Sequence, residues 1–149
     1  MPISRTLLCV VYAAIALLAL LATWHQNLAY FGSASGGPLS NMVGFWRETL
    51  ATPPSTSITL DLFLFGLAAT VWMVVEARRL GIRFVWLYVL AGALVAISVS
   101  FPLFLIARER RLPSVGPAPL SAALSRGDLG GLAAFGALNL SLALWSLMP

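Results

Sequence analysis

Charged side chains are scarce in this chain of 149 residues. Asp, Glu, Lys and Arg together make up 9% of the chain, against roughly 25% in typical soluble domains. Hydrophobic residues make up 60%, where soluble domains have about 45–50%. So few charges could not cover the surface of a soluble domain of this size. The composition therefore excludes a water-soluble globular protein and a disordered chain, and favours a membrane protein.

The chain also contains one cysteine, one histidine and no lysine. The single Cys9 excludes a disulfide scaffold, and with His25 it cannot form a zinc site or a haem pair, so we expect no metal and no cofactor. The nine basic residues are all arginines at the ends of apolar runs. Because they form no aromatic-interleaved stripe, we expect them to meet lipid head groups and not nucleic acid.

Long apolar runs predict about four transmembrane helices, since a membrane helix needs roughly 20 mostly apolar residues. The first run is too long for the apolar part of a signal peptide and lacks a cleavage pattern after it, which favours an anchor. The last run carries glycines and polar residues, so it could dock on the bundle without crossing. The sequence thus predicts an all-α polytopic membrane helix bundle, a single transmembrane domain over residues 1–149. The predicted helices are Thr6–Trp24, Ile58–Glu76, Phe84–Ala107 and Leu129–Leu147.

The predicted first loop, His25–Ser57, is long and nearly uncharged. Within it, apolar residues recur at helical spacing, which predicts a short interfacial helix at head-group level. Ser55 or Ser57, behind Pro53 and Pro54, is expected to cap the second span. The apolar positions are Leu39, Met42, Val43, Trp46 and Leu50.

The four-helix arrangement divides the arginines almost evenly between the two membrane sides, so the positive-inside rule nearly cancels. We expect a cytoplasmic N-terminus in a bacterial cytoplasmic (inner) membrane, because the first helix usually dominates orientation. The N-terminal side would hold Arg5, Arg78, Arg79 and Arg83, and the other side Arg47, Arg108, Arg110, Arg111 and Arg126.

Three titratable residues are candidates for chemistry. For Asp61, one reading is a first-turn acid stabilised by the helix dipole, and a second is one member of a proton-shuttling pair with His25. A third reading is structural pairing with an arginine or with loop backbone. Glu76 lies 15 residues after Asp61, about 22 Å along a helix, so the two carboxylates cannot share a site within it. Glu76 reads as a boundary ion pair with Arg79, or as a buried salt bridge tying the second helix to the third.

The end of the third run supplies structural or lipid-binding candidates. Arg108 and Arg110 belong to a charged run that reads as a solvated anchor or as a lipid-phosphate contact. Pro102 removes a backbone donor, which frees the carbonyl of Ser98 and predicts a kink. In a membrane, that carbonyl needs another partner.

Small residues recur at four-residue spacing in the third and fourth predicted helices. Such faces let helix backbones approach closely, within the chain, against a second copy or against a partner membrane protein. The two faces are Gly92/Ala96/Ser100 and Ala133/Ala137/Ser141.

Several motifs from Asp61 to Leu112 resemble a bacterial membrane-protein family catalogued as domain of unknown function 2834. The most specific are Glu76-x-Arg-Arg79-x-Gly81 and Phe101-Pro-Leu-Phe-Leu105 followed by Arg108-Glu-Arg110. The resemblance covers roughly residues 7–112, and the tail departs from it. It implies a membrane architecture, typically of three spans, and no activity.

We expect a small multi-pass protein without an evident catalytic site, an accessory or scaffold subunit, because packing faces and boundary charges outnumber groups fit for a site. One alternative is a membrane enzyme acting on a lipid or isoprenoid, like a terpene cyclase, through isolated carboxylates. Another is a transporter or proton-conducting element. Both need a carboxylate on a cavity or path, and Asp61 or Glu76 would have to supply it.

Overall fold

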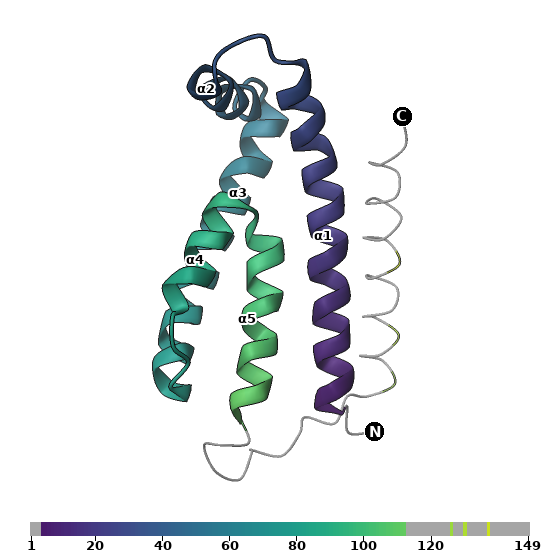
Figure 1. Cartoon of the computed structure of the whole chain (residues 1–149), viewed down its shortest axis with the longest axis vertical. Coiled ribbons are helices and arrows are strands. Elements are labelled where there is room, and N and C mark those ends of the chain that lie inside the picture. Colours follow the sequence, from purple (N-terminus) through teal and green to yellow (C-terminus); the bar gives the residue numbers. More distant parts are fainter. Residues whose placement is uncertain (1–3, 113–125, 127–129, 131–136, 138–149) are drawn as a thin grey trace.

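The computed structural model describes residues 4–112, 126, 130 and 137, and this part of the chain is all-helical. Figure 1 shows α1 rising along one side, α2 lying across the top, and α3, α4 and α5 making up the rest. The five helices are α1 (Arg5–Ser33), α2 (Pro38–Thr49), α3 (Pro53–Leu80), α4 (Val85–Leu94) and α5 (Ile97–Arg111).

Helix α1 is longer than predicted. Its N-cap is Ser4, whose side chain accepts a hydrogen bond from the amide of Leu7. The prediction that the helix gives way to a loop at His25 is wrong, since α1 continues to Ser33. Hydropathy locates the end of an apolar run, whereas the helix ends only where the glycine- and serine-rich segment begins.

Helix α2 is the short helix predicted inside the first loop. An aromatic cluster ties it to the end of α1 and to α3. In this cluster the Tyr30 hydroxyl donates to Glu48 over 3.3 Å, and the Thr59 hydroxyl on α3 donates to the carbonyl of Thr49 over 3.1 Å. The rings belong to Tyr30, Phe31, Phe45, Trp46 and Phe63.

Helix α3 begins earlier than predicted because the two prolines are inside it. The N-cap is Thr52, so the prediction of Ser55 or Ser57 as the cap is wrong. Thr52 and Ser55 exchange reciprocal hydrogen bonds between side chain and backbone amide. Pro53 and Pro54 fit the first turn, where the missing amide hydrogens would have no helical partner. At the other end Gly81 adopts a left-handed conformation, φ 65°, and its amide donates to Ala77.

The prediction of one continuous third helix, Phe84–Ala107, is wrong, because this segment forms two helices, α4 and α5. The chain reverses at Val95 and Ala96, and α4 and α5 pack side by side as a helical hairpin (Figure 1). The rings of Tyr88 and Phe104 lie 5.7 Å apart. On a continuous helix those 16 positions would be separated by about 24 Å.

The hairpin is the centre of the packing. Met73 and Ala77 of α3, Val85 of α4 and Phe104 of α5 form the buried core. The other side of α5 packs along α1, so α5 lies between α1 and the α3–α4 pair. The predicted fourth helix, Leu129–Leu147, falls outside the described residues apart from two isolated positions.

Two described helices, α1 and α3, are long and apolar enough to cross a membrane. At 1.5 Å per residue they are about 43 and 42 Å long, more than the roughly 30 Å of a hydrocarbon core. Helix α4 is about 15 Å and α5 about 22 Å, so neither reaches that length.

Gly92 permits the close approach of α4 and α5. A Cβ atom there would come within 2.8 Å of the Ser100 hydroxyl and 3.1 Å of Ile97 Cδ1. We expect Gly92→Leu to lower the free energy of unfolding by about 1–3 kcal/mol through overpacking, measured by thermal unfolding in detergent.

Gly66→Leu is the matched control, because a Cβ atom at Gly66 on α3 would meet nothing within 4 Å. Equal unfolding temperatures for the two variants would contradict the hairpin.

Candidate functional site

The clearest concentration of polar groups is an ion-pair cluster at the end of the hairpin, centred on Glu76. Its side chain is only 8% exposed. Arg79, one turn along α3, approaches Glu76 Oε2 with its Nε at 3.0 Å. Arg108 of α5 donates from Nε to Glu76 Oε1 over 2.7 Å. Both carboxylate oxygens therefore bind guanidinium groups, one from the same helix and one from across the hairpin.

Arg108 connects this carboxylate to a second one. Its Nη1 donates to Oε1 of the buried Glu109 over 2.8 Å, and its guanidinium lies 5.8 Å from the centre of the Trp72 ring. The cluster thus joins α3 and α5 at one end of the bundle.

The sequence predicted each of these two roles for Glu76 as an alternative, and the structure contains both. Arg79 is the boundary partner, with its side chain 63% exposed, and Arg108 is the buried partner on a later helix. The four-helix arrangement placed Arg79 and Arg108 on opposite membrane sides, which is wrong for the described bundle. The reversal at Val95 and Ala96 returns α5 to the end where α3 finishes (Figure 1).

The other candidates on the hairpin occupy different surroundings. Pro102 is buried inside α5, Ser98 is exposed near its start, and Arg110 is exposed near its end. Between them lies Ser100, which is 1% exposed and whose hydroxyl has no hydrogen-bond partner among the described residues. Gly92 and Ser100 of the predicted packing face point at each other within the hairpin, and Ala96 lies at the reversal.

Asp61 and His25 are not brought together. Both side chains are exposed, and neither a hydrogen bond nor an ion pair joins them in the described structure. Because α3 begins at Pro53, Asp61 lies on its third turn, so the first-turn assignment is wrong. Nothing in the described geometry gives this pair a shared site.

Sequence reasoning missed Glu109 and Trp72 as members of the cluster. Glu109 stands among three arginines, a pattern typical of a solvated helix end, yet it is 7% exposed. Trp72 precedes Glu76 by one turn, and that spacing was the available signal. No group of three or more metal-ligating side chains gathers among residues 4–112.

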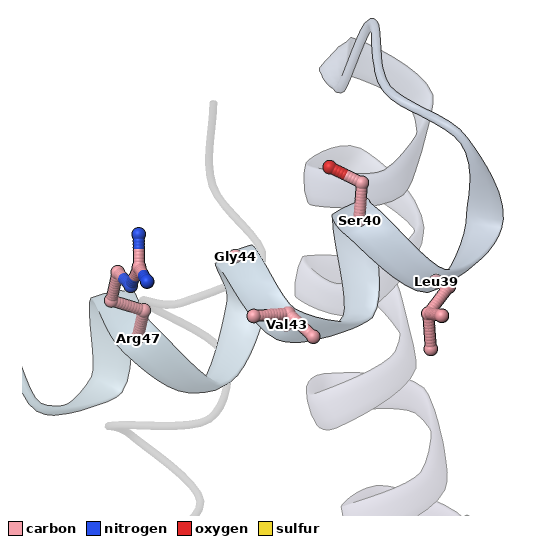
Figure 2. Close-up of a pocket in the computed structure, with 5 residues that line it drawn as sticks. All are labelled: Leu39, Ser40, Val43, Gly44 and Arg47. Carbon is pink, nitrogen blue, oxygen red and sulfur yellow. The ribbon is translucent and has the colours of Figure 1, made fainter.

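The described residues form two surface hollows. One, of about 600 Å³, lies at the opposite end of the bundle from the cluster, and its described lining residues all belong to α2 (Figure 2). Its lining residues are Leu39, Ser40, Val43, Gly44 and Arg47. The other lies at the base of the hairpin, between α4 and α5.

This fold defines a class: an all-helical protein in which two apolar helices of membrane-spanning length flank a half-length helical hairpin pinned by a buried ion-pair cluster. Residues 11–110 match the family described as protein of unknown function DUF2834, and the chain belongs to that family. The matched segment contains the whole cluster and the whole reversal. No curated protein and no solved structure matches the chain.

The buried pair and the exposed pair should differ in stability. We expect Glu76→Gln to lower the free energy of unfolding by about 3–5 kcal/mol, because it leaves Arg108 without its main counter-charge in a part-buried site. Arg79→Gln should cost less than about 1 kcal/mol, since its side chain is mostly exposed.

A double-mutant cycle of Glu76→Gln and Arg108→Gln, read by unfolding in detergent, measures the coupling directly. Additive effects of the two substitutions would contradict the pairing.

Proposed function

We propose that this protein is a small multi-pass membrane protein without a catalytic site, an accessory or scaffold subunit of a bacterial inner-membrane assembly. The observation that carries the proposal is the exposure of the apolar side chains on its two long helices. Only 6% of the most apolar window of α1 and 11% of that of α3 are buried within the described bundle.

A soluble protein would cover such helices with its own chain. Here large apolar side chains along both helices face outward, among them Leu17, Leu28 and Leu64 with exposed fractions of 57%, 62% and 66%. An uncovered apolar surface of this extent is typical of a surface that meets lipid or another membrane protein. This supports a role in which the outer faces bind partners.

The placement of the acids also supports a non-enzymatic role. A membrane acid catalyst of the terpene-cyclase kind needs a carboxyl group free to give up a proton in an apolar chamber. Both oxygens of Glu76 are engaged by arginines, and Arg108 also engages Glu109. The Glu76–Arg108 ion pair therefore holds α3 and α5 together.

The hairpin also supports a cytoplasmic N-terminus. It gathers seven of the nine arginines at the end where α1 begins, whereas Arg47 on α2 lies at the other end. Positive residues are enriched on the cytoplasmic side of bacterial membrane proteins. The seven are Arg5, Arg78, Arg79, Arg83, Arg108, Arg110 and Arg111.

The scaffold role is tested by photo-crosslinking in the native membrane. With benzoylphenylalanine in place of Phe65, which is 58% exposed on α3, we expect a cross-link to another membrane protein. With the same group in place of Phe101, which packs against the core, we expect cross-links only within the chain. Lipid adducts alone from both positions, together with a monomer in mild detergent, would refute the role.

The orientation is tested by labelling cysteines with an impermeant maleimide in a Cys9→Ala background. Ser35→Cys, in the segment between α1 and α2, should react in intact cells. Arg78→Cys and Arg110→Cys should react only after the membrane is opened, because the hairpin puts both at the N-terminal end. Reaction of Arg110→Cys, but not of Arg78→Cys, in intact cells would contradict the hairpin and support a single third helix that crosses the membrane.

A further inference from the structure

A groove of about 800 Å³ opens at the base of the hairpin. It is formed by the turn before α4, the first part of α4 and the last part of α5. Its lining residues are Ile82, Arg83, Phe84, Tyr88, Leu103, Ile106, Ala107, Arg110 and Arg111.

The rim of the groove carries uncompensated positive charge. Arg83 and Arg110 are exposed, come from different elements and have no acidic partner in the described structure. Arg79 and Arg108, at the same end of the bundle, are instead engaged with Glu76. Arg111 also lines the groove, and none of the described lining residues is acidic. An anion entering the groove would therefore meet at least two unengaged guanidinium groups.

The apolar part of the groove lies deeper along both helices. On α5 the lining runs from Leu103, through Ile106, to the arginines at its end, a rise of about 12 Å. On the other wall it runs from Arg83, at the base of the hairpin, to Tyr88, which lies deeper along α4. Charge at the helix ends and apolar surface toward mid-depth match the two parts of a phospholipid, a phosphate and an acyl chain.

Phe84 adds an unusual feature at the mouth. It is the only non-glycine among residues 4–112 with a positive φ, 60°, and its side chain is 73% exposed. A left-handed backbone costs a bulky residue roughly 1–2 kcal/mol. The turn therefore holds an aromatic ring outward at the level of the rim arginines, the depth at which aromatic residues meet lipid head groups.

We propose that this groove binds one anionic phospholipid, with its phosphate between Arg83 and Arg110 and an acyl chain along Tyr88, Leu103 and Ile106. The proposal rests on the membrane location proposed above. The occupant is a lipid and not a free phosphate, because the groove continues as an apolar wall beyond the arginines. The charge complementarity of the rim selects an anionic head group over a zwitterionic one.

The test is lipid binding to the full chain in detergent, measured by native mass spectrometry with phosphatidylglycerol and phosphatidylcholine of identical acyl chains. We expect the native chain to prefer phosphatidylglycerol, and Arg83→Gln with Arg110→Gln to weaken its binding about tenfold or more. Arg5→Gln with Arg78→Gln is the matched control, since it removes equal charge from exposed positions at the same end, outside the groove. The control should keep the native preference.

Each contrary result overturns the proposal. Equal loss in both double variants means a general charge effect, and no preference between the lipids means no head-group site. Inorganic phosphate that displaces the lipid at millimolar concentration means an anion site without a lipid. Benzoylphenylalanine in place of Leu103, which is 44% exposed, should capture lipid; capture of a protein segment instead means another occupant. Release of the chain from membranes by alkaline carbonate would refute the membrane location itself, which separates that failure from failure of the groove.

Discussion

The contact between Glu76 and Arg108 is the constraint on which the described bundle depends, since it joins the end of α3 to the end of α5 at 2.7 Å. Helices α4 and α5 are each shorter than a hydrocarbon core, so neither is held in place by spanning it. Removing one partner of such a buried pair leaves a charge without compensation, a loss larger than the net value of the pair. The pair therefore contributes mainly by disfavouring other packing arrangements of the helices. Any arrangement that separates α5 from α3 leaves the carboxylate of Glu76 buried without a counter-charge.

The same reversal sets the electrostatics of the molecule. A straight third helix would send the charged run that begins at Arg108 to the far side, and the arginines would balance. Folding α5 back against α4 puts that run beside Arg79 and Arg83 instead. Within this group of arginines, Arg79 and Arg108 neutralise Glu76. Arg83 and Arg110 line the groove and have no acidic partner among the described residues. The reversal between α4 and α5 thus accounts for the ion pair between α3 and α5, for the unequal distribution of arginines and for the candidate lipid site.

The sequence predicted the helical class, the long helices α1 and α3, the short helix α2 and the Glu76–Arg79 pair, because each follows from local composition and spacing. It offered a buried salt bridge from Glu76 to the next helix only as an alternative, and it did not identify Arg108 as the partner. It did not predict the reversal. An uncharged run of 24 residues between Arg83 and Arg108 has the same hydropathy whether it crosses once or folds on itself. The available signals were Gly92, Ser100 and Pro102, and they indicated packing and a kink without a direction. The burial of Glu109 depends on that tertiary arrangement, so local patterns could not reveal it.

The tip of the hairpin bears on why such a protein would act in an assembly. Helix α5 begins at Ile97 without a capping side chain, and the amides of Val99 and Ser100 both donate to the carbonyl of Ala96 at the reversal. The Ser100 hydroxyl is buried and has no hydrogen-bond partner among the described residues. Within a bilayer, irregular backbone persists only where protein or a water-filled cavity covers it, since each unsatisfied group costs several kcal/mol in hydrocarbon. Helix α1 covers one side of α5, but Leu94 at the end of α4 is 69% exposed. In the proposed membrane setting, a hairpin whose tip is partly bare is most stable when a neighbouring helix lies across it, and this supports the proposed role as a subunit of a membrane assembly.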